Sequence, residues 1–565
     1  MHALTRATRL HLPRSCSLRQ HRARPCASAK HRHAATQAAA MSKQPESSRC
    51  LSLLEAAKTR VKAQLILDKD STTAATAICV HPVTASSLES FLQELNQPAA
   101  AAWASINKFK AKSGEVLLVP NEHGAVSAAV LGVGEASADL WAYAALPGKL
   151  PPGSYKLALP EAAGRAAADK ALLGWMLGCY KFSRYKTGKL DKQQQQASTS
   201  EEEKPMLLVP QAADIAAVTP LAEGYFWCRD MINTPAEDMS PQDLAAEAAA
   251  LAATHAGTSL QVIEGEDLLT ANYPAVHTVG RAAARPPALI DLSWSPTSSS
   301  SGGVGDAGID SAAAAAAEEL PLVALVGKGV CFDTGGLDLK TAQGMKLMKK
   351  DMGGAALMLA LSHVVVSARL PVRLRVLLPA VENAVSGSSY RPGDVLQTRA
   401  GMTVENGNTD AEGRLILADA IYEAACSSPD VLIDAATLTG AARVALGPEL
   451  PVVFSNSDDT WAQMEAAAEQ ESDPMWRLPL WQGYRKQLDS KVADLSSTGE
   501  PGQAGAITAA LFLQEFAQQA RAWVHVDTAG WVSGGGTGPG RPEGGEALGL
   551  RALWRFLQAR YGAPT

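Results

Sequence analysis

The chain has 565 residues, of which 47% are hydrophobic and 19% are charged, and its formal net charge is −6. A chain of this length is too long for one hydrophobic core, so at least two domains are expected. No apolar run reaches the roughly 18 to 20 residues that a membrane-spanning helix needs, so we expect neither a membrane span nor a membrane partner.

The first 45 residues differ in composition from the rest. They carry seven Arg and two Lys, and no acidic residue occurs before Glu46. An Arg-rich, acid-free segment without a long apolar stretch is typical of an organelle transit peptide rather than of a secretory signal. We therefore expect residues 1–45 to be a disordered transit peptide for the chloroplast. The alternatives are a mitochondrial or cytoplasmic location, and a plain disordered basic tail.

Without this leader the chain is strongly acidic. The other residues include 42 basic and 57 acidic side chains, a formal net charge of −15. Such a surface repels phosphate backbones, so nucleic acid is not expected as a partner. The eight cysteines are scattered without a C-x-x-C pair. This pattern is typical of a reducing compartment and argues against a disulfide framework or a thiolate zinc site.

Residues 51–188 alternate strand-like and helix-like segments. The apolar runs at 115–120 and 128–133 are typical of strands, and residues 161–180, which follow a proline, are typical of a helix. No group of catalytic side chains converges in this part of the sequence. We interpret it as a smaller N-terminal α/β domain that serves packing or assembly.

Two stretches of biased composition interrupt the chain. Residues 189–204 are polar and of low complexity, and they predict a linker at 189–214. Residues 296–319 are rich in Ser, Gly and Ala and predict an insert in a surface loop. We expect neither stretch to carry function.

Residues 215–565 show a longer alternation and are predicted to be the larger, catalytic domain. Strands are expected at 288–294, 322–326, 374–378 and 430–435, and helices at 224–232, 241–255 and 351–368. This order predicts an α/β domain with a mixed central sheet flanked by helices. Ligands of such sheets bind at the carboxyl ends of the strands. Lys328 and Thr437 each follow a strand directly, which places them at that edge.

Carboxylates, rather than histidines, are the candidate metal ligands of this domain. Its histidines are widely separated and form no H-E-x-x-H pattern, so a thermolysin-like zinc site is not expected. Four carboxylates would together balance two divalent cations, and without metal they would repel one another and take up protons. They are Asp333, Asp351, Asp410 and Glu412.

Basic residues accompany these carboxylates. Asp410, Glu412 and Arg414 are spaced two apart, so on an extended segment they would share one face, although a solvated charge cluster has the same spacing. Lys328 and Lys340 could be salt-bridge partners, or one could ligate a metal as a neutral amine if its pKa fell well below about 10.4. Arg414 can hold an anion but cannot act as a base. Spacing alone leaves these roles open.

Three motifs resemble the signature of the leucyl (cytosol) aminopeptidase family. They are V-G-K-G-V-C-F-D-T-G-G at 326–336, M-K-K-D-M-G-G at 348–354 and N-T-D-A-E-G-R-L at 408–415. Shorter matches include R-P-G-D at 391–394 and N-T-P at 233–235. The resemblance covers roughly residues 220–555 and implies a metal-dependent hydrolase that removes N-terminal amino acids from peptides.

The resemblance also implies a metal site. Two divalent cations, Mn²⁺ or Zn²⁺ and alternatively Mg²⁺, would be held by five ligands, of which Asp333 and Glu412 would bridge. The five are Lys328, Asp333, Asp351, Asp410 and Glu412. A water between the cations would attack the scissile carbonyl, and the free amine of the peptide would bind one cation.

Further roles follow from the same resemblance. Lys340 would stabilise the developing oxyanion, and Arg414 would hold a bicarbonate that moves a proton. Met348, Thr437 and Gly440 would line the pocket for the N-terminal side chain of the peptide. The resemblance implies a hexamer. Two other functions stay open at this point, a non-catalytic assembly or binding protein with this fold and a two-metal phosphoesterase.

Overall fold

The computed structural model describes residues 52–67, 75–95, 98–134, 139–160, 163–186, 204–296 and 318–562. The predicted transit peptide lies outside these residues, as do residues 189–203 of the predicted linker and 297–317 of the predicted insert. Among the described helices, none combines the length and the apolar character needed to cross a membrane.

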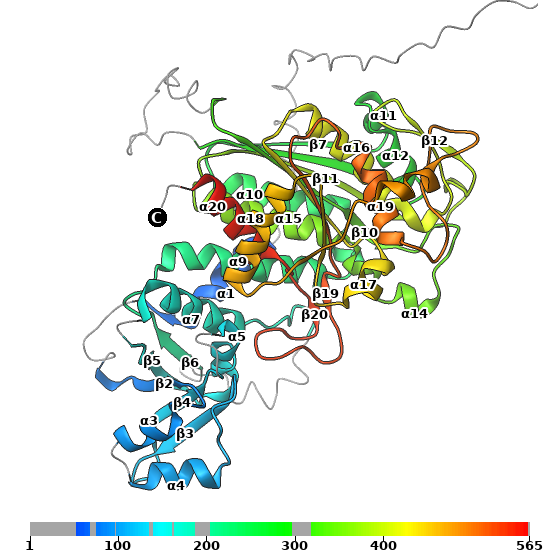
Figure 1. Ribbon diagram of the computed structural model, residues 1–565. Helices are drawn as coiled ribbons and strands as arrows, with labels where there is room; N and C mark the ends of the chain where they lie inside the picture. The colour runs from blue at the N-terminus through cyan, green and yellow to red at the C-terminus, as the bar shows by residue number, and fades with distance from the viewer. Residues whose placement is uncertain are drawn as a thin grey trace, which may run out of the picture. The chain divides into compact units, whose positions relative to one another are not determined.

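The N-terminal domain contains a six-stranded sheet in the order β1-β6-β5-β2-β4-β3 (Figure 1). Its strands are β1 (Leu65–Ile66), β2 (Ile78–Val83), β3 (Val116–Pro120), β4 (Val126–Gly132), β5 (Gly153–Leu157) and β6 (Pro205–Leu208). Its helices are α1 (Leu53–Lys62), α3 (Leu88–Glu94), α4 (Pro98–Ile106), α5 (Leu140–Tyr143), α6 (Leu146–Lys149) and α7 (Gly164–Gly178). The strands expected at 115–120 and 128–133 are β3 and β4, and the helix expected at 161–180 is α7.

One part of the predicted linker is a strand. β6 lies within residues 189–214, pairs in parallel with β5 and β1, and thereby becomes an inner strand of the sheet. Four residues that begin with a proline carry little strand signal of their own, so the pairing with distant strands decides their conformation.

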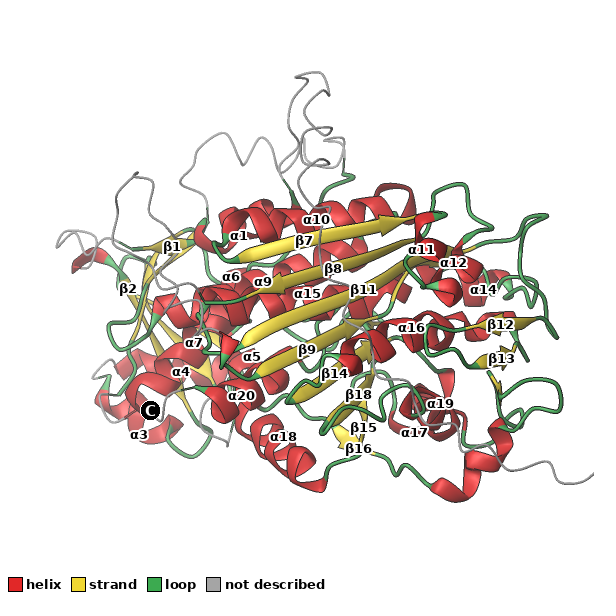
Figure 2. Ribbon diagram, turned by 90° about the horizontal axis from the view of Figure 1, so that it is seen from above, coloured by secondary structure: helices red, strands yellow, loops and turns green. Residues whose placement is uncertain are grey.

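The larger domain is built on a mixed sheet in the order β16-β15-β18-β14-β9-β11-β8-β7, with β10 paired to β11 (Figure 2). Its strands are β7 (Thr258–Glu264), β8 (Ala288–Trp294), β9 (Leu322–Gly327), β10 (Gly329–Asp333), β11 (Arg373–Asn383), β14 (Val431–Ala436), β15 (Val452–Ser455), β16 (Trp476–Arg477) and β18 (Trp523–Asp527). The central strands β11, β9, β14 and β18 run parallel. β7 and β8 pair antiparallel with their neighbours, and β15 pairs antiparallel with β18 but parallel with β16. The predicted mixed sheet is confirmed.

Helices cover both faces of this sheet. One face packs against α9 (Ile215–Asn233), α10 (Pro241–Thr254), α15 (Gly353–Ser367), α18 (Asp458–Glu471) and α20 (Leu550–Tyr561). The other face packs against α12 (Pro274–Gly280), α16 (Glu412–Cys426) and α19 (Gly505–Gln514). Short elements complete the domain: α11 (Asp267–Thr270), α14 (Ala342–Met345), α17 (Gly440–Leu446), β12 (Val395–Gln397), β13 (Thr403–Glu405), β17 (Leu495–Ser496), β19 (Trp531–Val532) and β20 (Gly544–Gly545). Four segments are 3₁₀-helical: η2 (Ala236–Asp238), η3 (Met348–Met352), η4 (Thr409–Ala411) and η5 (Gln482–Leu488).

The α15 helix lies unusually close to the sheet at its first residues. A Cβ atom on Gly354 would lie 2.0 Å from the carbonyl oxygen of Ala435 on β14, so only glycine fits this position. The close contact brings η3, which directly precedes α15, to the edge where β9 and β14 end. This edge carries the predicted site.

Candidate active site

Four of the predicted metal ligands converge at the carboxyl ends of the central strands. Lys328 directly follows β9, Asp333 ends β10, Asp351 lies in η3, and Glu412 is the first residue of α16. All four are buried, with at most 3% of each residue exposed. One carboxylate oxygen of each acid lies within 4.8 Å of those of the other two. Segments that are more than 80 residues apart in the chain therefore form one acidic cluster.

Lys328 occupies the middle of this cluster. Its Nζ lies 2.8 Å from Asp351 Oδ2 and 2.9 Å from Glu412 Oε1, and it donates a hydrogen bond of 3.1 Å to the carbonyl of Thr437. A Cβ atom on Gly413 would lie 2.7 Å from this Nζ, so the glycine of the D-A-E-G-R motif makes room for the lysine.

A second lysine closes the solvent side of the cluster. Lys340 Nζ lies 2.8 Å from Asp333 Oδ2 and also contacts Asp410, whose side chain is 32% exposed. Asp333 is held from behind, because its Oδ1 accepts hydrogen bonds from Gly335 N at 2.8 Å and from Asn383 Nδ2 at 2.9 Å. Asp410 is therefore the accessible member of the set, at the rim of the site.

The segment that carries Asp410, Glu412 and Arg414 is not extended, so that prediction was wrong. Asp410 lies in η4, and α16 begins at Glu412. The Asn408 side chain accepts a hydrogen bond from Asp410 N at 2.8 Å and starts this turn. A spacing of two residues fits the start of a helix as well as a strand, and burial of α16 on the sheet decides between them.

Arg414 lies deeper than the rim. Its Nη1 donates a hydrogen bond of 2.6 Å to the carbonyl of Ser497, and its buried Nε has no hydrogen-bond partner among the described residues. Burial lowers the pKa of Arg414 to about 10, which still leaves the guanidinium charged at neutral pH. An unpaired buried donor of this kind is suited to an anion.

The three residues predicted to line a substrate pocket also lie at this edge. Met348 begins η3 and is half-buried, and Gly440 begins α17. No atom lies within 4 Å of the position of a Cβ on Gly440, so the space beside it is open. The hydroxyl of Thr437 is already engaged, because it donates a hydrogen bond of 2.8 Å to Asp351 Oδ1. Thr437 therefore orients a carboxylate of the cluster.

The charges of the cluster shift its pKa values strongly. Burial and the charge of Asp333 raise the pKa of Glu412 to about 8, and the same two causes raise that of Asp410 to about 6. Burial also raises the pKa of Asp351. Burial acts to lower the pKa of Lys328, but the charges of Asp351 and Glu412 outweigh it and raise that pKa above its ordinary value. The carboxylates are thus crowded enough to resist full ionisation.

The residues present fit divalent cations. The cluster supplies carboxylate oxygens from three elements, and Glu412 Oε2 is buried without a hydrogen-bond partner in the described part of the chain. Oxygen ligands suit Mn²⁺ and Mg²⁺, and zinc also accepts them. Cations there would relieve the repulsion that raises the pKa of Glu412.

The metal-free protein is expected to lose stability as the pH rises. The folded Glu412 carboxyl keeps its proton up to about pH 8, whereas the unfolded one releases it near 4.5. Because the native state binds more protons in this window, its free energy of unfolding falls between about pH 4.5 and 8. Scanning calorimetry of chelator-treated protein at several pH values measures this decline.

Two comparisons check the origin of this pH dependence. The Glu412→Gln variant should show a shallower decline, because its side chain does not titrate, and saturating Mn²⁺ should remove the decline by keeping the carboxylates ionised. A metal-free protein whose unfolding temperature rises between pH 5 and 8 would contradict the expectation.

Two partners of the site escape prediction from the sequence. Asn383 ends β11 and holds Asp333, and Ser497 offers its carbonyl to Arg414. Asn383 follows the same rule as Lys328, a polar residue at the carboxyl end of a parallel strand, and could have been found that way. Ser497 acts through its backbone, so its side-chain type carries no signal.

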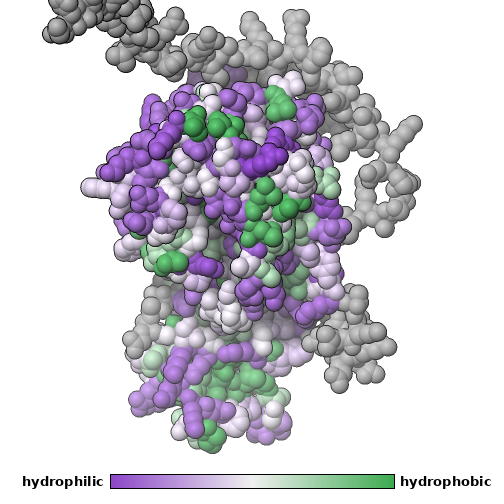
Figure 3. All heavy atoms as spheres, turned by 90° about the vertical axis from the view of Figure 1, so that its right-hand side faces the viewer, coloured by the Kyte–Doolittle hydropathy of each residue, from purple (hydrophilic) through white to green (hydrophobic). Residues whose placement is uncertain are grey.

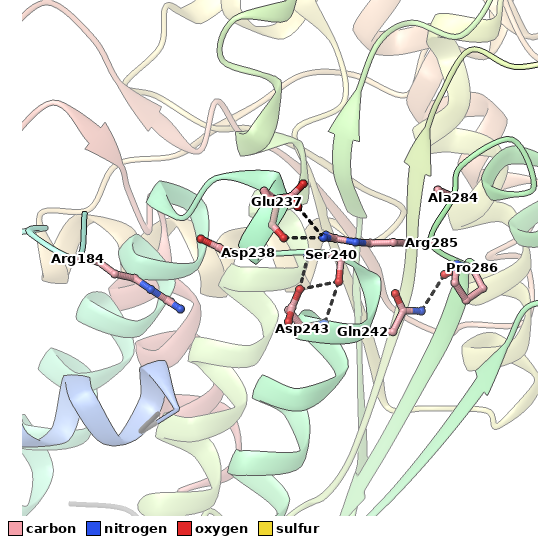
Figure 4. A pocket seen from close by; sticks show the side chains of 9 residues that line it. All are labelled: Arg184, Glu237, Asp238, Ser240, Gln242, Asp243, Ala284, Arg285 and Pro286. Atoms are coloured by element: carbon pink, nitrogen blue, oxygen red, sulfur yellow. Dashed lines mark hydrogen bonds and ion pairs between the residues drawn. The ribbon is translucent and has the colours of Figure 1, made fainter. Parts of the chain in front are cut away.

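A separate pocket of about 480 Å³ lies beside η2 and the start of α10 (Figure 4). Five of its lining residues are charged, and two of these, Arg285 and Glu237, form an ion pair. Arg285 donates to the Glu237 carbonyl at 2.7 Å and lies 3.5 Å from the Glu237 carboxylate. None of the predicted site residues lines this pocket. The acidic cluster at the strand ends therefore remains the candidate active site.

Two family models match this chain, one in each domain. The model described as "Cytosol aminopeptidase family, catalytic domain" matches residues 226–554, and the one described as "M17 aminopeptidase, N-terminal domain" matches residues 78–195. A "Probable cytosol aminopeptidase" of Chlorobium luteolum is 34% identical over 511 residues, which are 85% of this chain and 96% of the relative.

Solved structures agree with this placement. The cytosol aminopeptidase from Coxiella burnetii superposes with a TM-score of 0.76 at 41% identity, over 88% of this chain and 99% of that one. The bottromycin maturation enzyme BotP in complex with Mn gives a TM-score of 0.70 at 29% identity, over 86% and 99% of the two chains. The two matched ranges lie in the two domains, and the range 226–554 spans the positions of the converging carboxylates. The chain therefore belongs to the cytosol aminopeptidase family and is a metal-dependent hydrolase that removes N-terminal amino acids from peptides.

Proposed function

We propose that the acidic cluster holds two divalent cations and that the residues around it have separate roles in peptide hydrolysis. The observation that supports this most directly is the burial of Asp333, Asp351 and Glu412 within 4.8 Å of one another around Lys328. When all are ionised, these three carboxylates and Asp410 carry more negative charge than Lys328 and Lys340 compensate, which is costly unless cations complete the site. Asp410, at the rim, would be the fourth carboxylate of the set.

Five residues would bind the cations. Asp333, Asp351, Glu412 and Lys328 would hold the cations from the buried part of the cluster, and Asp410 would hold them from its exposed rim. The cations would supply Lewis acidity towards a carbonyl and lower the pKa of a bound water. Lys328 is protonated in the metal-free site, so binding of a cation beside it must release a proton.

Lys340 and Arg414 would act on the substrate rather than on the cations. The Lys340 ammonium lies at the solvent side of the cluster, and the charge of Asp333 keeps its pKa above the ordinary value against the effect of burial. A fixed positive charge there would stabilise an oxyanion that develops on the scissile carbonyl. The unpaired Nε of Arg414 would hold a small anion such as bicarbonate, which could accept and return a proton. This role is tested by measuring how the turnover of the Arg414→Lys variant depends on the bicarbonate concentration.

Substrate selection would depend on the free space at Gly440 and on the half-buried Met348, with Thr437 orienting Asp351. A peptide whose amine reaches the cations can place only its N-terminal residue there, because the cluster is closed from behind by Asn383 and Gly413. This geometry supports an exopeptidase.

Turnover of leucine amide, N-acetyl-leucine amide and a phosphate ester by chelator-treated protein, with Mn²⁺, Zn²⁺ or Mg²⁺ added back, tests the proposal. We expect cation-dependent hydrolysis of leucine amide and none of the other two substrates. Hydrolysis of the acetylated amide would show that a free amine is not required, and hydrolysis of the phosphate ester would favour a phosphoesterase. Mn²⁺ is the cation we propose, since carboxylate oxygens dominate the site and BotP binds Mn.

The oligomeric state and the cellular location of the protein are also proposed. Several large apolar side chains of the larger domain are exposed, including Leu339 at 61%, Trp481 at 60% and Val492 at 67%, and apolar patches are visible on the face in Figure 3. Exposed apolar surface of this kind supports a homo-oligomer, which we propose to be a hexamer and which light scattering would measure. Residues 1–45 are proposed to direct import into the chloroplast, which a fluorescent fusion of this segment would test.

A further inference from the structure

A tyrosine of the N-terminal domain is hydrogen-bonded to the helix end nearest the site. Tyr180, which follows α7, is buried, and its hydroxyl donates to Asp230 Oδ1 at 2.9 Å. The same hydroxyl accepts a hydrogen bond from Asn233 Nδ2 at 3.0 Å. Two guanidinium groups also contact the ring, that of Arg229 at 5.0 Å and that of Arg60 at 5.9 Å from its centre. Tyr180 is thus held through its ring and through its hydroxyl.

Asn233, the last residue of α9, makes two further hydrogen bonds. Its Oδ1 accepts a hydrogen bond from Gly545 N at 2.8 Å, and its backbone carbonyl accepts one from Lys349 Nζ at 2.6 Å. The side chain has no spare room, because a Cβ on Gly544 would lie 2.6 Å from Oδ1. Tyr180 and Gly545 therefore hold the Asn233 side chain from both ends of its amide, next to the backbone carbonyl that Lys349 contacts.

Lys349 connects this carbonyl to the site. It lies in η3, two residues before Asp351, and its ammonium also lies 5.6 Å from the centre of the Trp531 ring. Both contacts are made to neutral groups, and no ion pair of Lys349 with a carboxylate is present in the described residues. Since η3 is a single short 3₁₀ segment, a displacement of Lys349 moves Asp351 with it.

We propose that Tyr180 is a positioning residue of the active site, which acts through Asn233 and Lys349 on the 3₁₀ segment that carries Asp351. The inference rests on the proposed function, because it takes Asp351 as a metal ligand. It assigns to the N-terminal domain an indirect part in building the site, through two intervening residues. Residues that hydrogen-bond directly to a metal ligand commonly contribute about 10- to 100-fold to metal affinity or activity, so the lower end of this range is expected for a residue that acts through two others.

The test uses the metal-free full chain with the Tyr180→Phe change. The hydroxyl is lost, Asn233 Nδ2 loses its acceptor, and the carbonyl that holds Lys349 is free to shift. We expect Mn²⁺ to bind about tenfold more weakly in isothermal titration calorimetry. At low Mn²⁺, kcat/KM for leucine amide should fall by a similar factor and should recover at saturating Mn²⁺, which general loss of folded protein would not allow.

Two further variants separate positioning from stability. Tyr185→Phe is the matched control, because it removes a tyrosine hydroxyl that donates to Asp238 outside this chain of contacts. Lys349→Met removes the last contact of the chain, and its effect should not add to that of Tyr180→Phe in the double variant. Wild-type Mn²⁺ affinity in Tyr180→Phe, equal weakening in Tyr185→Phe, or additive effects in the double variant would each overturn the inference.

The Asp351→Asn variant distinguishes an error about the positioning role of Tyr180 from an error about the metal site itself. If Asp351→Asn binds Mn²⁺ as tightly as the unchanged protein, Asp351 is no ligand and the proposed function fails first. If Asp351→Asn weakens binding and Tyr180→Phe does not, only the positioning role is wrong.

Discussion

Glu412→Gln is expected to lower kcat/KM for leucine amide by roughly 10²- to 10³-fold. Glu412 is 1% exposed, contacts Lys328 and lies within 4.8 Å of the carboxylate oxygens of Asp333 and Asp351. The amide keeps the shape of the side chain and removes the charge that two cations require. A loss of about 3–4 kcal/mol of transition-state stabilisation corresponds to this loss in rate, and it is similar in size to the cost of breaking a buried ion pair.

Steady-state kinetics at saturating Mn²⁺, together with calorimetric titration of Mn²⁺, measure the effect of Glu412→Gln. The matched control is Glu423→Gln, which makes the same chemical change three turns along α16, where Glu423 pairs with Arg375 and Arg399. Full activity of Glu412→Gln would remove the main support for a two-cation site, whereas equal loss in both variants would point to damage of the helix.

Lys340→Met is expected to lower kcat about 10²- to 10³-fold while KM changes little, because a fixed charge that meets a developing oxyanion acts mainly in the transition state. The stem of the side chain is retained, and the ammonium that lies 2.8 Å from Asp333 is lost. Unlike the change at Glu412, this one should not weaken Mn²⁺ binding, because it removes a positive charge from beside the carboxylates.

The two measurements together separate a catalytic role of Lys340 from a structural one. Lys346→Met serves as the control, since Lys346 is an exposed lysine of the same loop region. A Lys340→Met enzyme with unchanged kcat, or one whose only defect is weaker Mn²⁺ binding, would show that Lys340 merely compensates the charge of Asp333 and Asp410.

Local patterns were enough to predict much of the larger domain. Apolar runs bounded by glycines and charged residues predicted β8, β9 and β14, and the α/β class followed from their alternation with helices. The placement of Lys328 and Thr437 at the carboxyl edge is confirmed, because each directly follows a strand. This rule succeeds because parallel strands all end at one edge of their sheet.

The errors occurred where distant contacts decide the conformation. β6 was expected to be linker because four residues after a polar run have little strand signal, and its pairing with β1 and β5 makes it a strand. Residues 410–414 were expected to be extended because a spacing of two fits a strand. Packing of α16 on the sheet makes Glu412 the start of a helix instead.

The residue types and motifs of the chain specify which carboxylates, lysines and arginine are available for catalysis. The fold decided which of these residues are buried together. It also decided that Thr437 orients Asp351 and that Tyr180, more than 150 residues away from Asp351 in the chain, reaches the 3₁₀ segment that carries it. The physical reason is that pKa shifts, repulsion between carboxylates and hydrogen-bond partners depend on distances through space, which the order of residues does not contain.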